Sequence, residues 1–155
     1  MFAEFLGGVT TDYLLRRTGS VRIARSALIA ASWTLAVASL VPAIFVHDLI
    51  IGVTSFTFAL FFLSFAISPM WTATIDIAPN YAGSASALMN AAGAVAGIFS
   101  PLAFGWILDR TGSWTAPFAV SLGLLLFGAV MTNWFRPDRQ VESVPGFDSF
   151  AVRNA

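Results

Sequence analysis

The sequence contains no cysteine and no lysine, and it contains a single histidine. The absence of cysteine excludes disulfide bonds, thiol catalysis and thiolate metal sites, and His47 cannot build a metal site by itself. Charged residues make up 10% of the chain, whereas a soluble domain is about 25% charged. So few charges would not cover the surface of a soluble protein, and the hydrophobic content of 57% therefore indicates an integral membrane protein.

Four long apolar stretches account for most of the 155 residues. A helix needs roughly 20 apolar residues to cross a bilayer core about 30 Å thick. The stretches that meet this requirement are about 23–46, 49–75, 84–108 and 114–135. We expect an all-α transmembrane domain over residues 1–137 and a tail over residues 138–155. Residues 1–6 are too few to span, and we expect them to be the last turns of an earlier helix, with a short interfacial helix as the alternative.

The placement of the arginines predicts how the spans are oriented in the membrane. The arginines before or at the start of the first span are Arg16, Arg17, Arg22 and Arg25, and those after the fourth span are Arg136, Arg139 and Arg153. Because four crossings return the chain to the side on which it began, both groups share one side, which we expect to be the cytoplasmic side of the cell membrane. The C-terminus is then cytoplasmic, and Arg110 lies on the opposite side.

Small residues follow one face of the third span. Gly93, Gly97, Pro101 and Gly105 recur every four residues, and Asn90 continues this line. Small residues let helix backbones approach closely in lipid, so the glycines indicate a tight contact with another helix. An amide inside the membrane costs free energy unless it is paired. Asn90 therefore either bonds a neighbouring helix or faces an aqueous cavity and contacts a solute.

The end of the second span carries hydroxyl groups and an indole. Ser68 and Thr72 share one helix face, Trp71 lies beside it, and Pro69 removes a backbone hydrogen bond and should bend the helix. This arrangement suits a substrate cavity, although hydroxyls also bond their own helix and Trp71 is also suited to anchoring at the membrane interface. Asp76 lies at the helix C-terminus, where the macrodipole disfavours a negative charge, so it needs a cation partner, as in a gate-closing pair, or water.

One pattern occurs twice in the chain. Residues 8–20 begin G-x-x-x-D and end R-x-G-S, and residues 105–113 read G-x-x-x-D-R-x-G-S. Both lie at or near the end of a predicted helix, so we expect two turns of similar geometry. Repeated helical units of this kind are common in transporters.

These motifs resemble those of the major facilitator superfamily. The run "GGVTTDYLLRRTG" resembles the superfamily loop G-x-x-x-D-(R/K)-x-G-R-R, in its copy between helices eight and nine, with Tyr13 in place of the expected base. The run "DIAPNYAGSASALMNAAGAVAGIFSPLAFGWILDRTGSW" is similar to helices ten to twelve of the anion:cation symporter branch. The resemblance covers nearly all of residues 3–137 and implies that the four spans are helices nine to twelve of the C-terminal half, preceded by the end of helix eight.

The resemblance implies a secondary transporter that moves a small organic anion by symport with a cation, expected to be a proton, through alternating access of two six-helix halves. The substrate-binding residues that it implies are Ser68, Trp71 and Asn90. The residues that we expect to act in conformational change or gating are Gly8, Asp12, Arg16, Arg17, Asp76, Gly93, Gly97, Pro101, Gly105, Asp109 and Arg110. The expected partners are the anion, the coupling cation, membrane lipids and a missing N-terminal half; no cofactor, metal or nucleic acid is expected.

The spans themselves limit what this chain can do alone. They contain no basic residue away from their edges, and Glu4 and Asp76 both lie near ends. An anion in a low-dielectric cavity needs a cation or several strong donors, so we expect charge recognition and coupling to lie in the missing half. The alternative is a free-standing four-span subunit or assembly partner. An enzyme is not expected, because the sequence shows no nucleophile–base pair, metal-ligand cluster or interior carboxylate pair.

Overall fold

The computed structural model describes residues 1–46, 48–132 and 134, and in this part of the chain it contains helices and turns but no strand. The helices are α1 (Phe2–Thr18), the π-helical turn η1 (Ile23–Ala27), α2 (Leu28–Phe45), α3 (Leu49–Ile77), the 3-10 turn η2 (Pro79–Tyr81), α4 (Ala82–Thr111) and α5 (Thr115–Thr132). The expectation of an all-α protein is confirmed. The predicted tail, the arginines after the fourth span and His47 lie outside the described residues.

Four helical segments are long and apolar enough to cross a membrane. They are Ile23–Ala43, Leu49–Ile77, Pro79–Thr111 and Thr115–Thr132. They fall on the four stretches expected from the sequence, with ends that differ by a few residues. The mean hydropathy of their most apolar windows lies between 1.6 and 2.2.

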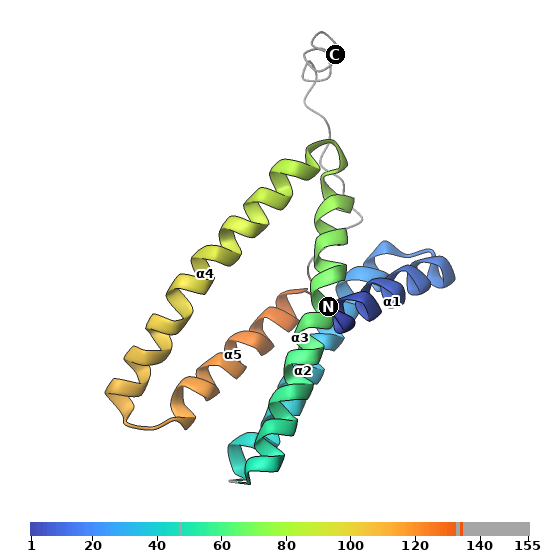
Figure 1. Cartoon of the computed structure of the whole chain (residues 1–155). Coiled ribbons are helices and arrows are strands. Elements are labelled where there is room, and N and C mark those ends of the chain that lie inside the picture. Colours follow the sequence, from blue (N-terminus) through green and yellow to red (C-terminus); the bar gives the residue numbers. More distant parts are fainter. Residues whose placement is uncertain (47, 133, 135–155) are drawn as a thin grey trace.

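The helices pack unevenly (Figure 1). α2 and α3 lie side by side, α1 packs against α3 and η1, and α5 packs against α2. α4 leaves the end of α3 through η2, diverges from it, and meets α5 at the far end. The core is therefore built by α1, α2, α3 and α5, and α4 stands at its edge.

Small side chains make the core contacts possible. The buried alanines of η1, α2 and α3 are Ala24, Ala36, Ala59, Ala66 and Ala73. Between α2 and α5, a Cβ on Gly128 would lie 2.6 Å from Cζ3 of Trp33, so only glycine leaves room for this indole. These contacts agree with packing in lipid, where close backbone approach rather than hydrophobicity drives helix association.

The first helix is longer than the sequence suggested. The run at residues 7–20 was expected to be a connector, but it is helical as far as Thr18. Gly7 and Gly8 lie inside this helix, and both pack against α3. The chain turns instead at Gly19, which has a positive φ of 65° and donates its N–H to the Leu15 carbonyl at 2.9 Å.

The expected pair of similar turns is confirmed. Gly112 ends α4 with φ 60° as Gly19 ends α1 with φ 65°, and each donates its N–H to the carbonyl four residues earlier. The threonine before each glycine donates its hydroxyl to its own helix, and its oxygen accepts the N–H of the following serine. The repeated Thr-Gly-Ser sequence thus specifies a left-handed helix end twice, because glycine adopts this conformation without steric cost.

Candidate functional site

A buried arginine joins three helical segments at one end of the bundle. Arg25 lies in η1, and its side chain is 6% exposed. Its Nε donates to Oδ2 of Asp76 on α3 at 2.9 Å, and its Nη1 donates to Oγ1 of Thr11 on α1 at 2.9 Å. The Asp12 carboxylate lies 3.8 Å from the same Nη1. We call Thr11, Asp12, Arg25 and Asp76 the arginine cluster.

Thr11 links the arginine cluster to the backbone of η1 by a hydrogen bond. It is fully buried, and its hydroxyl donates to the Ala24 carbonyl at 2.6 Å while accepting from Arg25. All described buried side-chain polar atoms have a hydrogen-bond partner, as burial requires. The cluster therefore ties α1, η1 and α3 together with no polar group left uncompensated.

The arginine cluster decides between the two alternatives for the partner of Asp76, and it adds Arg25 to the candidate site. Asp76, at the C-terminal end of α3, has a cation partner rather than water alone. Sequence reasoning used Arg25 only as a marker of orientation and did not place it in a site. The unmet charge of Asp76 was the signal that could have led to it, since an acidic group at a helix C-terminus favours a nearby base.

The other predicted basic residues stay outside this cluster. Arg16 and Arg17 are exposed, and Arg17 donates from Nη1 to the Tyr13 hydroxyl at 2.9 Å, with its guanidinium 5.9 Å from the ring centroid. Tyr13, which stands where the loop motif expects a base, thus engages an arginine instead. At the opposite end of the bundle, Arg110 lies 5.4 Å from the ring centroid of Trp106, and Asp109 is exposed.

Two glycines bring α1 into direct contact with α3. A Cβ on Gly7 would collide with the Phe65 carbonyl oxygen, and a Cβ on Gly8 would lie 3.0 Å from Oγ of Ser68. Gly7 therefore requires glycine for this packing, because its neighbour is backbone, whereas a side chain at Gly8 would press on the Ser68 hydroxyl. The contact matters for the site, because it sets α1 beside the part of α3 that carries the predicted substrate-binding residues.

A groove of about 450 Å³ lies along this α1–α3 contact. Its lining includes Ser68, Trp71 and Thr72 from α3, and Glu4 and Phe5 from α1. Thr72 bonds its own helix, as its Oγ1 lies 3.1 Å from the carbonyl oxygens of both Ser68 and Pro69. Ser68 and Trp71 thus share one groove, and it also receives the carboxylate of Glu4. We call this the α1–α3 groove.

Asn90 is placed elsewhere. It lies on α4, which has no buried residue, and it is not part of the lining of the α1–α3 groove. Ser68 and Asn90 nevertheless lie at comparable distances, measured along their helices, from the turn that joins α3 and α4. Ser68 lies nine residues before the end of α3 and Asn90 eight residues after the start of α4, which is roughly 12–14 Å in each case at 1.5 Å per residue.

The small-residue face of α4 has no partner within the described part of the chain. A Cβ on Gly93, Gly97 or Gly105 would meet no other group within 4 Å, and Pro101 is exposed. The described link between α3 and α4 near Asn90 is a contact of 3.2 Å from the Thr74 hydroxyl to the Met89 sulfur. The tight contact expected for these glycines is therefore not formed with α1, α2, α3 or α5.

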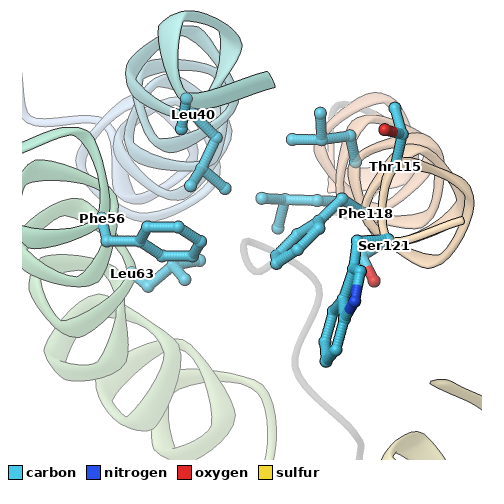
Figure 2. A pocket seen from close by; sticks show the side chains of 10 residues that line it. Leu40, Phe56, Leu63, Thr115, Phe118 and Ser121 are labelled. Atoms are coloured by element: carbon cyan, nitrogen blue, oxygen red, sulfur yellow. The ribbon is translucent and has the colours of Figure 1, made fainter. Parts of the chain in front are cut away.

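A second cavity, of about 430 Å³, lies among α2, α3 and α5 (Figure 2). Its walls include Leu40, Phe56, Leu63 and Phe118, and the Ser121 hydroxyl bonds back to the Pro117 carbonyl at 2.8 Å. Trp114, Thr115 and Ser121 also line this cavity, so it too offers an indole and hydroxyl groups. The α1–α3 groove is preferred because it brings together Ser68 and Trp71, two of the residues expected to bind the substrate. No group of three potential metal ligands gathers within the described residues.

Comparisons with known proteins bear on this site. A family model described as the Major Facilitator Superfamily matches residues 1–149. A probable sulfoacetate transporter of Cupriavidus necator is 36% identical over 152 residues, which is 98% of this chain and 35% of that protein. A probable galactarate/D-glucarate transporter of Escherichia coli is 36% identical over 111 residues, covering 70% of this chain and 24% of that protein.

A chloroplastic ascorbate transporter of Arabidopsis thaliana is 38% identical over 78 residues, covering 50% of this chain and 14% of that protein. The chain thus spans about a third or less of the length of these three relatives. No solved structure matches the chain significantly.

Proposed function

The chain belongs to the major facilitator superfamily, and we propose that it forms part of a secondary active transporter that moves a small organic anion across the membrane. The compounds named for the three relatives are all organic acids that are anionic at neutral pH. The observation that carries the proposal is the α1–α3 groove. It lies beside the interior of a membrane-spanning helix and brings together Ser68 and Trp71.

The groove has the chemistry to bind a neutral edge or a delocalised anionic group of a solute. Neither the Ser68 hydroxyl nor the Trp71 indole N–H makes a hydrogen bond within the described residues, so both donors remain available. Neutral donors stabilise an anion less than a cation does, so we propose that a further segment of the transporter supplies a positive charge. Asn90 would add an amide from α4 in the complete protein.

The arginine cluster would act in the transport cycle by holding helices together. It connects α1, η1 and α3 within this chain, so breaking and remaking it is not required for two halves to rock against one another. We propose that it keeps these segments moving as one body. Asp12, whose side chain is 65% exposed, remains open to a partner on another segment and is the better candidate for a state-dependent contact.

The orientation and coupling follow from the same proposal. The end of the bundle that carries the arginine cluster would face the cytoplasm, since arginines favour that side. Alternating access would expose the α1–α3 groove to each side in turn, and a proton would accompany the anion.

A hybrid protein tests the function directly. In it, this chain replaces the 152 matched residues of the Cupriavidus necator transporter, and we call the product the hybrid transporter. We expect cells that produce it to take up radiolabelled sulfoacetate faster than cells that produce a matched protein lacking the segment. Equal uptake by both, at equal amounts of protein in the membrane, would contradict the proposal.

A free-standing four-span subunit is the second candidate, favoured by the unpartnered small-residue face of α4. Such a face would suit a symmetric contact between two copies of the chain. The two candidates separate when the chain is produced alone. A subunit would form dimers that Gly97→Leu disrupts, whereas a transporter part would show no such defined dimer.

A further inference from the structure

Glu4 lies in the α1–α3 groove together with the residues proposed to bind the anion. It belongs to the first turn of α1, its side chain is 42% exposed, and it lines the groove opposite Ser68 and Trp71 of α3. It is eight residues from Asp12, or about 12 Å along the helix axis at 1.5 Å per residue. Glu4 is thus a carboxylate separate from the arginine cluster. The other wall of the groove is α3, a helix long and apolar enough to span a membrane, and an ionisable residue beside such a helix makes a functional role the first hypothesis.

The other described carboxylates are engaged elsewhere. Asp12 and Asp76 belong to the arginine cluster, and Asp48 caps α3 by accepting the N–H groups of Ile50 and Ile51. Asp109 lies at the exposed end of α4. Among the described acidic residues, Glu4 is therefore the one that lines this groove.

Few charged groups face Glu4. The groove lining from α3 is Ile67, Ser68, Trp71 and Thr72, none of which is ionisable. The Met1 amino group lies 3.7 Å from Oε1 of Glu4 on its own helix. From η1, Arg25 is turned to the arginine cluster, where Asp76 also lies. Among the described residues, Glu4 is therefore the ionisable side chain nearest to an anion in the groove.

We propose that Glu4 takes up the proton that accompanies the anion. This inference rests on the proposed function, because it requires that the α1–α3 groove holds an anion. The ionised carboxylate repels a bound anion. At about 6 Å and an effective dielectric constant of about 20, that repulsion lowers the affinity about a hundredfold. The protonated carboxylic acid carries no charge and donates a hydrogen bond to the anion.

Proton and anion therefore bind together. A proton from the side of higher acidity transfers to the Glu4 carboxylate as the anion enters, and it returns to water on the other side when the anion leaves. Thermodynamic linkage makes the effect reciprocal, so the bound anion also strengthens proton binding. No group other than the proton is transferred, and the carboxylate is regenerated in each cycle.

The hybrid transporter tests this assignment with Glu4→Gln. Glutamine resembles the protonated acid in shape and charge, so we expect the variant to bind sulfoacetate with the same affinity at every pH. In the unmodified hybrid, the affinity should fall as the pH rises, by up to about a hundredfold. The variant should still exchange internal for external sulfoacetate, but a proton gradient should no longer drive accumulation. Glu4→Asp should restore the driven accumulation.

The matched control is Asp48→Asn, which also removes one carboxylate from the chain. Asparagine is as good a helix cap as aspartate, and Asp48 lies outside the groove, so this variant should accumulate sulfoacetate normally. In the hybrid, residue 1 follows a peptide bond, and the Met1 amino group no longer contributes a charge near Glu4.

The outcomes separate the two proposals. If the unmodified hybrid takes up no sulfoacetate at any pH, the proposed function fails, and the role of Glu4 fails with it. If the unmodified hybrid is driven by a proton gradient and Glu4→Gln is driven equally well, the assignment of Glu4 is overturned and the transport function stands.

Discussion

The helices α3 and α4 carry similar small residues and have opposite surroundings. α3 buries Ser55, Ala59, Ala66, Pro69 and Ala73, which lie three to seven residues apart. α4 carries glycines and a proline at intervals of four residues, yet it buries none of its residues. Figure 1 shows the same contrast, with α3 at the centre of the bundle and α4 diverging from it.

This difference shows what a row of small residues does and does not predict. It indicates that another helix backbone can approach closely, because no large side chain stands in the way. It does not indicate which helix will approach. On α3 the partners are α1 and α2 of the same chain. We therefore expect substitutions that disturb the contacts of α3 to lower the stability of this chain. Equivalent substitutions on α4 should have little effect on it.

The largest effect is expected when the arginine cluster is broken. Arg25→Ala leaves Asp76 and the buried Thr11 without their shared donor, and breaking a buried ion pair typically costs several kcal/mol. Since Asp76 is 32% exposed, we expect a loss of about 3 kcal/mol in the free energy of unfolding. Tryptophan fluorescence during denaturant unfolding in detergent measures it. Arg16→Ala removes an equal charge from the exposed surface and should change little.

If both arginine variants lose the same small amount of stability, the arginine cluster does not hold α1, η1 and α3 together. The proposed common movement of these segments would then have no basis.

A smaller effect is expected from adding one methyl group at the α1–α3 contact. Gly7→Ala places a Cβ against the Phe65 carbonyl, and we expect a loss of about 2 kcal/mol from overpacking. Gly97→Ala on α4 is the matched control, because its new Cβ meets no other group within 4 Å. Thermal unfolding of the two variants should differ clearly, and equal midpoints would show that α1 does not pack on α3 as described.

For Asn90 we expect the reverse, because a substitution on α4 should reduce transport while leaving the stability of the chain unchanged. Because Asn90 is exposed in this chain, Asn90→Ala should leave the unfolding of the chain unchanged. In the hybrid transporter, the same substitution should lower sulfoacetate uptake at least about tenfold, which corresponds to about 1.4 kcal/mol of lost interaction. Leu88→Ala, at another exposed position of α4, is the control. Normal uptake kinetics in Asn90→Ala would remove Asn90 from the binding site.

The smallest effect is expected at Asp12. Its carboxylate is largely exposed and lies 3.8 Å from Arg25, so Asp12→Asn should lower the stability of the chain by less than about 1 kcal/mol. The difference should shrink further in high salt, because salt screens exposed charges. A loss as large as that of Arg25→Ala would show that Asp12, rather than Asp76, is the main partner of the arginine.

Local signals in the sequence predicted local structure well. The two Thr-Gly-Ser turns were expected from a repeated pattern, and both are present with the same hydrogen bonds. The same approach failed for the run that follows Gly8, where a loop motif suggested a connector and the chain is helical as far as Thr18. Gly7 and Gly8 pack against Phe65 and Ser68, residues far along the chain that no local pattern identifies.

The residues of the candidate site also divide into those that the sequence predicted and those that it did not. Ser68 and Trp71 were grouped by their helical spacing, and the family resemblance implied them as substrate-binding residues. They share the α1–α3 groove. Glu4 and Arg25 were each set aside, since one stood near the start of the chain and the other at the edge of a span. Arg25 bonds Asp76 of α3, and Glu4 lines a groove whose other wall is α3, so their surroundings depend on how α1 and η1 pack against that helix.

The sequence by itself determined the class of protein, the four apolar spans and the family, because these depend on composition, length and short motifs. Only the tertiary structure decided that Arg25 is buried against Asp76 and that Glu4 lines the groove of Ser68 and Trp71. It also decided that the small-residue face of α4 meets no other helix among the described residues. The physical reason is that a charge or a small residue acquires its role from the group that meets it. In this chain that group lies on another helix.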